Sequence, residues 1–293
     1  MADLNDASVW RLRLATSVAP AYAMDAAVAA VAVGGSTARG CADRHSDVEL
    51  AVWWHDTPTA DQRRHAAERM PEMGARRDFG YDVALDAWSE DCTVFGVKLD
   101  IGHRTVAGME RLLTAVVDDD GSTERQHVAA ELLGAIPLHG DGLIDRWRRR
   151  VEPYPEALAI ALVGSQLRFG PHAWLERLVE RDEVLALAEI RVAAARAILG
   201  VLLALNRTYH PGHKWIARTM DAMAIRPPDL NSRFRLVLTG PPDAAVRELR
   251  GLIEETVGLV ERHLPQVDTT GVRARIQTRG AVWDQPPLAM RGR

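Results

Sequence analysis

The stretch over residues 31–52, VAVGGSTARGCADRHSDVELAV, constrains this chain most, because it places a glycine-rich turn and two acids between apolar runs. Residues two positions apart on a strand point to the same face, so Asp47 and Glu49 project together while Val48 and Leu50 project into a core. Two neighbouring carboxylates on a half-buried strand repel each other and lose hydration. Such a pair predicts a bound cation, and its oxygen donors favour Mg²⁺.

The turn before the acids is a candidate phosphate site. Gly34 and Gly35 let the backbone approach a ligand closely, and Ser36 stands at the start of a short helix expected over residues 37–41. Backbone N–H groups at such a start favour phosphate. Either motif alone is more often a plain turn or a solvated edge strand. Their order between two apolar strands favours a site for a nucleoside triphosphate.

This arrangement resembles the nucleotidyltransferase superfamily of DNA polymerase β type, in which Gly-Ser is followed by an acidic-x-acidic pair and a third acid comes from a later strand. Gly35, Ser36, Asp47 and Glu49 match this pattern position by position. The fuller string GGSTARG…SDVEL is similar to antibiotic nucleotidyltransferases of the aminoglycoside and lincosamide type. One departure is Glu49, where Asp is commoner. Because Glu is one methylene longer, its carboxylate is expected to change the geometry of metal binding. The specific resemblance covers only the N-terminal part of the chain.

The third acid is expected on the β-rich segment TVFGVKLDIGH at residues 93–103. Its alternation puts Lys98 and Asp100 on one face and apolar residues on the other. The resemblance implies that Asp100 binds metal, deprotonates the acceptor hydroxyl, or does both. Asp86, with Asp82 before it in YDVALDAW, is the rival, although its alternation is less regular. Lys98 is expected to be a solvated strand lysine.

Composition predicts a globular protein of the cytoplasm. The 293 residues are 47% hydrophobic and 26% charged, and the net charge of −4 offers no general basic field for long nucleic acids. Two cysteines provide neither a disulfide framework nor zinc spacing. The N-terminal sequence lacks the order of a signal peptide. The apolar run at residues 19–33 is interrupted by Asp25 and is too short to span a membrane.

The pattern of secondary structure that the sequence predicts changes after residue 104. Residues 1–104 mix strand and helix patterns, which predicts an α/β catalytic domain with a small mixed sheet flanked by helices. Residues 105–265 predict an all-α bundle that binds the acceptor, and residues 266–293 an irregular tail. The helical spacing covers residues 106–116, 123–133, 142–150, 154–168, 172–180, 183–206, 214–223 and 243–263.

One loop of the helical part, NRTYHPGHKW at residues 206–215, crowds aromatic, imidazole and ammonium groups together. In antibiotic nucleotidyltransferases a lysine just inside a comparable helix contacts the triphosphate, and Lys214 resembles that residue. The alternative is a polar interhelix turn in which Tyr209 and Trp215 belong to the core.

Together these features predict a Mg²⁺-dependent enzyme that moves a nucleoside monophosphate, AMP from ATP, to a hydroxyl of a small acceptor such as an antibiotic. The acceptor alternatives are tRNA and protein, and a third possibility is a non-catalytic nucleotide sensor. The modest charge favours a small acceptor, and the intact acid set disfavours a sensor. Arg39 either meets phosphate or bridges to an acid. The expected metal ligands and catalytic acids are Asp47, Glu49 and Asp100, and the expected nucleotide contacts are Gly35, Ser36, Arg39 and Lys214.

Overall fold

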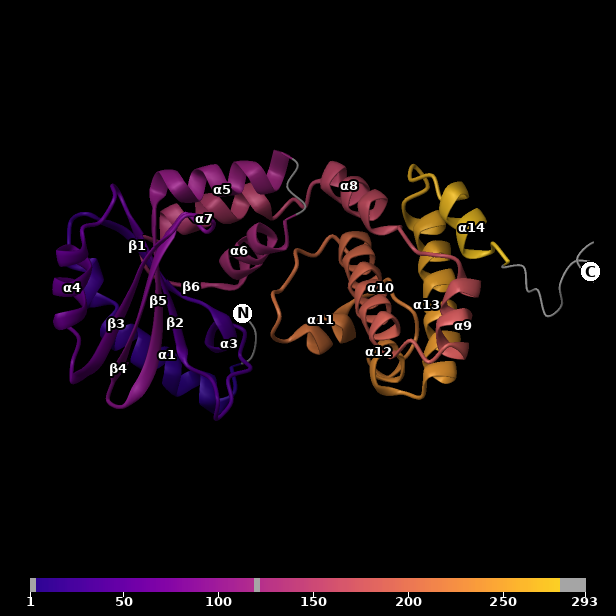
Figure 1. The fold of residues 1–293 in the computed structure, drawn as a ribbon. Coiled ribbons are helices and arrows are strands. Elements are labelled where there is room, and N and C mark those ends of the chain that lie inside the picture. The colour runs from indigo at the N-terminus through magenta and orange to yellow at the C-terminus, as the bar shows by residue number, and fades with distance from the viewer. Residues whose placement is uncertain (1–3, 119–121, 280–293) are drawn as a thin grey trace, which may run out of the picture. The chain divides into compact units, whose positions relative to one another are not determined.

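The chain divides into two compact units in the computed structural model, which describes residues 4–118 and 122–279 (Figure 1). Unit 1 consists of Met1–Leu158 together with Tyr209–Gly212. Unit 2 consists of Ala159–Thr208 and His213–Arg293.

Six strands of the described residues form one mixed sheet in unit 1, in the order β3-β4-β5-β2-β1-β6. β2 and β5 run parallel, and the other neighbouring pairs run antiparallel. The mixed α/β architecture predicted for the N-terminal part is confirmed. The strands are β1 (Val28–Val33), β2 (Val48–Trp54), β3 (Met73–Asp82), β4 (Ala87–Val94), β5 (Val97–Thr105) and β6 (Ile136–His139).

Helices lie on both faces of this sheet (Figure 1). On one face Val48 and Leu50 of β2 join Leu99 of β5 in a buried core with residues of α1, α2 and α4, as the alternation predicts. On the other face Trp53 packs against Trp147 of α7, with ring centroids 5.4 Å apart. The helices of this unit are α1 (Asp6–Val18), α2 (Pro20–Ala23), α3 (Gly35–Ala38), α4 (Ala60–Glu68), α5 (Val106–Asp118), α6 (Thr123–Gly134) and α7 (Asp141–Val151).

The division between the units falls after Leu158, whereas the sequence pattern predicts a boundary after residue 104. The difference arises because α5 contacts β5, α7 contacts β1, and β6 extends the sheet. Helical spacing identifies these elements but does not reveal that their apolar faces are buried on the sheet. The short segment Tyr209–Gly212 also belongs to unit 1, since the Tyr209 hydroxyl donates to the carbonyl of Val151 at 3.0 Å.

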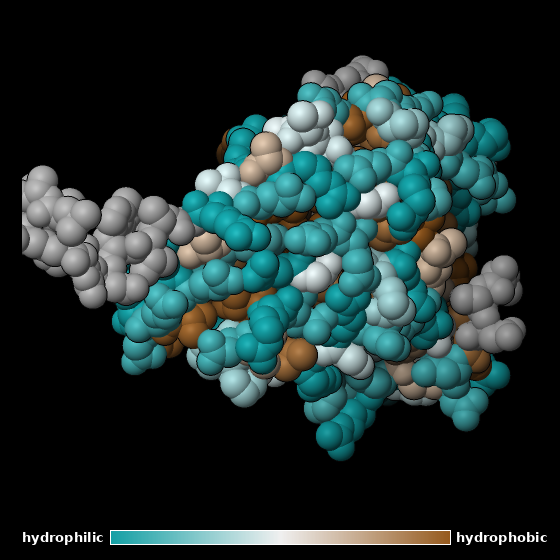
Figure 2. Space-filling model, turned by 90° about the vertical axis from the view of Figure 1, so that its right-hand side faces the viewer, coloured by the Kyte–Doolittle hydropathy of each residue, from teal (hydrophilic) through white to brown (hydrophobic). Residues whose placement is uncertain are grey.

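The regular secondary structure in the described residues of unit 2 is all helical, which confirms a helical C-terminal part. Its longest helices, α10 and α13, contain 22 residues each and contact each other. The surface seen in Figure 2 is mostly hydrophilic, with apolar residues in the furrows between hydrophilic ridges. The helices are α8 (Glu156–Gln166), which begins at the end of unit 1, α9 (His172–Glu180), α10 (Val184–Leu205), α11 (Ile216–Ala222), α12 (Leu230–Thr239), α13 (Pro242–His263) and α14 (Thr270–Ile276).

Helix α14 corrects the expectation of an irregular tail from residue 266. Val272 and Ile276 lie four positions apart and are both buried, so this short helix has one apolar face. The remainder of the expected tail, residues 280–293, lies outside the described residues. Among residues 4–118 and 122–279, no helix combines the length and apolar character needed to cross a membrane.

A buried polar network joins the core face of the sheet to α2. Glu90 of β4 is 2% exposed and accepts hydrogen bonds from the hydroxyl of Tyr22 at 2.6 Å and from His103 Nε2 at 3.1 Å. Arg76 of β3 forms an ion pair with the same carboxylate. The indole of Trp54 donates to His103 Nδ1 at 3.1 Å, which leaves the ring proton on Nε2 facing Glu90. Every partner of this buried carboxylate is therefore a donor.

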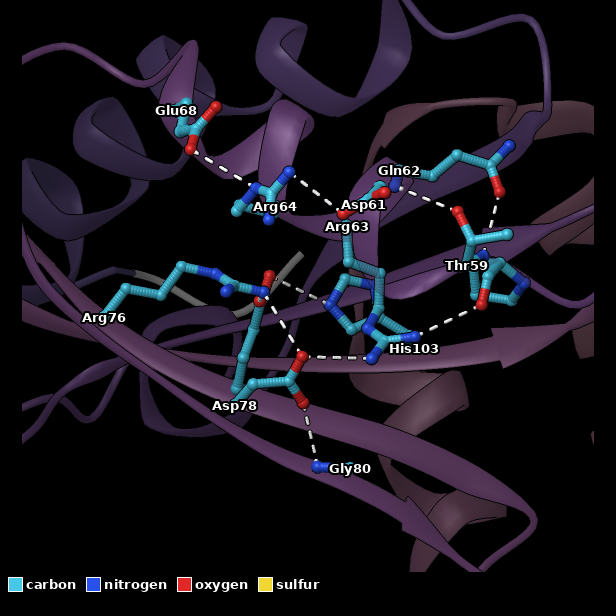
Figure 3. Close-up of polar contacts among 12 residues, drawn as sticks. Thr59, Asp61, Gln62, Arg63, Arg64, Glu68, Arg76, Asp78, Gly80 and His103 are labelled. Atoms are coloured by element: carbon cyan, nitrogen blue, oxygen red, sulfur yellow. Dashed lines mark hydrogen bonds and ion pairs between the residues drawn. The ribbon is translucent and has the colours of Figure 1, made fainter.

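The network continues to the edge of the sheet and to α4 (Figure 3). Arg63 of α4 donates to Asp78 of β3 at 3.0 Å, and Asp78 also lies beside Arg76. At the start of α4, Thr59 and Gln62 form a capping box that satisfies two backbone N–H groups. The strand at the edge of the sheet is thus held by charges as well as by backbone pairing.

Burial and partners shift the pKa values in this network in opposite directions. Burial would raise the pKa of Glu90, but the hydrogen bonds from His103 and Tyr22 and the charge of Arg76 outweigh it and lower that pKa. Burial lowers the pKa of His103 from 6.5, because the charged ring loses its hydration. The folded protein therefore holds His103 neutral where the unfolded chain binds a proton.

We expect the free energy of unfolding to fall as the pH drops below about 6.5, since protonation of His103 favours the unfolded state in this range. His103→Gln keeps an N–H group toward Glu90 but does not titrate there. Urea denaturation at about pH 7 and about pH 5 should therefore show a smaller loss of stability in the variant than in the wild type. Equal losses in the two proteins would contradict the assignment.

Candidate functional site

Four adjacent strands bring a row of polar positions together on one face of the sheet. Glu49 of β2 pairs in register with Asp100 of β5, and Asp100 pairs with Asp91 of β4. On the other side of β2, the N–H of Gly34 donates to the carbonyl of Glu49 at 2.9 Å. Positions in register on neighbouring strands project to the same face. The glycine turn, the predicted acid pair and the predicted third acid therefore lie in one row.

The carboxylates of this row crowd around one ammonium group. Lys98 Nζ lies 2.5 Å from Asp100 Oδ1, 3.8 Å from Asp47 Oδ2 and 4.0 Å from Asp91 Oδ2. Lys98 is exposed, as expected for a solvated strand lysine, but its charge is shared among three acids. The site thus already places one cation among these carboxylates.

The crowding shifts the titration of the third acid. Burial raises the pKa of Asp100, and hydrogen bonding to the neighbouring carboxyl group of Asp47 raises it further, while Lys98 offsets part of the shift. In return, the hydrogen bond to Asp100 raises the pKa of Lys98. Like-charged acids this close lose less free energy when a cation lies between them.

Asp91 is a member of the row that the sequence analysis did not single out. Its position follows from the turn between β4 and β5, where Phe95 and Gly96 both have positive φ, at 50° and 76°. Two such residues form the tight turn that fixes hairpin register. With Val94 opposite Val97, counting back along the hairpin places Asp91 opposite Asp100.

The turn after β1 brings its backbone against the acid pair. Gly35 has φ +57°, and a Cβ atom at this position would lie 1.9 Å from Glu49 Oε2. Only glycine therefore lets the Glu49 carboxylate lie against this backbone. The helix expected over residues 37–41 forms at Gly35–Ala38 instead, so Ser36 and Thr37 lie within it. Thr37 is 1% exposed, and its Oγ1 has no hydrogen-bond partner within the described residues.

A further acid reaches this turn from α6. Glu131 Oε2 accepts the N–H of Gly35 at 2.9 Å, and Glu131 Oε1 accepts Arg39 Nη2 at 2.5 Å. Of the two roles left open for Arg39, the bridge to an acid is the one observed. Sequence analysis missed Glu131, because α6 carries no motif that points to this turn.

Asp86, the rival third acid, lies away from the row. It immediately precedes β4, whereas Asp91 lies within that strand, and it accepts hydrogen bonds from Tyr81 at 2.8 Å and from Arg111 at 2.6 Å. Asp82 accepts the backbone N–H groups of the turn that follows it. Both residues therefore have structural partners of their own.

Lys214 belongs to unit 2 and lies just before α11. The helix predicted from residue 214 begins at Ile216, because Trp215 adopts a left-handed conformation with φ 65°. Tyr209 is buried in unit 1, and burial raises its pKa to about 12. The middle of the unusual loop, Tyr209–Gly212, therefore belongs to unit 1, whereas both of its ends belong to unit 2.

The donor set suits a hard divalent cation. Asp47 and Asp100 adjoin each other, while the Glu49 carboxylate lies against Gly35. In the described part of the chain, no three acidic, histidine or cysteine side chains are gathered as a ready-made metal-binding group. The oxygens match the preference of Mg²⁺, and the acids of the row outnumber the nearby ammonium of Lys98. These residues fit Mg²⁺ by chemistry and by excess negative charge.

Comparison with known proteins gives a short family match and a distant structural likeness. Residues 121–216 match the model of a domain of unknown function, DUF4037, which covers α6 to the start of α11 and not the acidic row. The chain is similar to a nucleotidyltransferase-like protein from Exiguobacterium sibiricum 255-15, with a TM-score of 0.39 and 11% identity over 86% of this chain and 77% of that one. This likeness is too distant to define fold or function. No curated protein matches the sequence.

A thermal titration tests the acid row directly. We expect millimolar Mg²⁺ to raise the melting temperature of the wild type by roughly 2–4 °C, the shift produced by about 1 kcal/mol of binding free energy. Asp47→Asn should lose most of this shift, because the amide keeps the shape but not the charge. Asp61→Asn, a change on the exposed surface of α4, serves as the control. A full shift in Asp47→Asn would remove that residue from the metal site.

Proposed function

We propose that this protein is a Mg²⁺-dependent nucleotidyltransferase that moves AMP from ATP to a hydroxyl group of an acceptor. The observation that carries the proposal is the single row formed by the Gly34–Gly35 turn, Glu49 and Asp100, with Asp47 beside it. A phosphate-binding turn next to acids is the combination that transfer between phosphate and hydroxyl requires.

Asp47, Glu49 and Asp100 would hold Mg²⁺. When bound, the metal would neutralise phosphate charge and stabilise the charge that develops on the entering and leaving oxygens. The ammonium of Lys98 among the same acids supports a cation-binding role for this row. Lys98 would also limit the repulsion between the acids before metal binds.

The triphosphate would be bound by the turn after β1. The N–H of Gly35, the hydroxyl of Ser36 and the guanidinium of Arg39 are donors on one short segment. Thr37 Oγ1, on the residue next to Ser36, is buried without a hydrogen-bond partner within the described residues. Hydroxyls of this kind are satisfied when a ligand or water accepts from them or donates to them.

Asp100 would take the proton of the acceptor hydroxyl. The acceptor oxygen then attacks the α-phosphorus of ATP, the bond from that phosphorus to its bridging oxygen breaks, and pyrophosphate leaves. The raised pKa of Asp100 makes its carboxylate a better base than an ordinary aspartate. Asp47 contributes to this basicity through its charge.

An open hollow of about 560 Å³ beside the acidic row offers space for the acceptor. A small hydroxylated molecule fits this volume, which supports the proposal of a small acceptor. The positive charge at this hollow is partly neutralised, because Lys98 pairs with the acids of the row and Arg11 is buried and donates to backbone carbonyls. The hollow is lined by Ala7, Trp10, Arg11, Asp43, Arg44, Ser46, Val97 and Lys98.

The role of the third acid is tested by two matched substitutions. Asp100→Asn should reduce transfer from α-labelled ATP at least about 100-fold, since the amide can neither take the proton nor hold the metal. Asp86→Asn should leave most activity, because Asp86 binds Tyr81 and Arg111 instead. Labelled products are counted after incubation with pools of antibiotics, tRNA and cell protein. Loss of activity in Asp86→Asn alone would reverse the assignment.

Lys214 is proposed as a further phosphate contact, so Lys214→Ala should weaken Mg²⁺-ATP binding by roughly tenfold, because a positioned ammonium offsets phosphate charge. Calorimetric titration of ATP with Mg²⁺ measures the effect, and the melting temperature should stay unchanged. Arg218→Ala, which removes an exposed cation from α11, is the matched control. Equal affinity in Lys214→Ala and the wild type would exclude the contact.

A further inference from the structure

Glu131 places both of its carboxylate oxygens on the turn that follows β1. Oε2 accepts the backbone N–H of Gly35 at 2.9 Å, and Oε1 accepts the guanidinium of Arg39 at 2.5 Å. The same Oε2 would lie 3.1 Å from a Cβ atom on Gly34. The carboxylate therefore lies directly over the glycine backbone.

A carboxylate in this position uses the donors that a phosphate group would need. Phosphate and carboxylate oxygens both accept charge-assisted hydrogen bonds from backbone N–H groups and from arginine. One N–H group serves one strong acceptor at a time, so Glu131 and a phosphate oxygen cannot both occupy the N–H of Gly35. Two negative groups at this distance also repel each other.

Glu131 uses both of its carboxylate oxygens at this turn, which is more than an ion pair with Arg39 requires. Arg39 and Glu131 are 22% and 25% exposed at their side chains, and one carboxylate oxygen would suffice to pair the guanidinium. The second oxygen binds a backbone group of the turn that carries Ser36. Of the hydroxyls beside it, that of Thr37 is buried and has no partner within the described residues.

Helix α6, which carries Glu131, packs against a segment far along the chain, residues 209–212. Gln126 Oε1 accepts the N–H of His210 at 3.3 Å, and a Cβ atom on Gly212 would lie 2.7 Å from the ring of His127. His127 Nδ1 lies 3.9 Å from Glu131 Oε1. All of these residues belong to unit 1.

We propose that Glu131 competes with a nucleotide phosphate for the N–H of Gly35 and for Arg39, and thereby sets the nucleotide affinity of this protein. The inference rests on the proposed function, because it concerns the same phosphate site. Nucleotide binds only in the fraction of molecules in which Glu131 has left the turn, and the apparent dissociation constant rises by the inverse of that fraction. When Glu131 leaves, Arg39 becomes available to the phosphate.

The test is a calorimetric titration of ATP with Mg²⁺ into the wild-type protein and Glu131→Gln. The amide keeps the size of the side chain and removes its charge, so the variant should bind ATP about tenfold more tightly. Inorganic tripolyphosphate, titrated in the same way, should gain by the same factor, because the competition concerns phosphate contacts and not the base. Glu131→Asp, which retains the charge on a shorter side chain, should bind with intermediate affinity and gives a second measurement if Glu131→Gln does not fold.

Glu248→Gln is the matched control. Glu248 pairs with Arg233 in unit 2, and the exposures of these two side chains, 23% and 18%, resemble those of Glu131 and Arg39. Its affinity for ATP should equal that of the wild type. Unchanged or weaker binding in both Glu131 variants, with ATP bound by the wild type, would overturn the inference and leave the proposed function standing. Absence of ATP binding in every protein would overturn the proposed function itself.

Discussion

The parallel pairing of β2 with β5 is the constraint on which the rest of the site depends. Val48 and Leu99 are paired in register and fully buried, so their apolar contacts fix the register of the two strands. A slip by one residue would turn the acids into the core. The hydrophobic face of the sheet therefore forces Glu49 beside Asp100, and the charge of Lys98 reduces the repulsion that results.

Because successive side chains of a strand point to opposite faces, two neighbouring acids of β4 lie on different sides of the sheet. Glu90 faces the core and is satisfied by His103, Tyr22 and Arg76, whereas Asp91 faces the open row beside Asp100. An acid with a complete set of donors in the core stabilises the fold, while acids that share one ammonium retain the capacity to bind a cation. The sheet thus carries the hydrogen-bonded carboxylate of Glu90 and the row formed by Glu49, Asp100 and Asp91 on opposite faces.

The segment matched by the DUF4037 model contributes to the site from outside the acidic row. It includes α6, which supplies Glu131, and residues 209–212, which contact α6. Through Glu131 this segment reaches the backbone of Gly35 and the guanidinium of Arg39. Under the proposed function, this segment therefore places an acid on the turn that would bind phosphate.

The sequence by itself determined the features that depend on local spacing. Alternation in β2 and β5 defined the buried face and favoured Asp100 over Asp86, the glycines marked the turn, and the spacing of apolar residues predicted the helical second part. Only the tertiary structure decided the boundary after Leu158 and the place of Glu131, which is 96 residues from Gly35. The reason is physical: a period along the chain states which side of an element is apolar, but not which distant element will cover it.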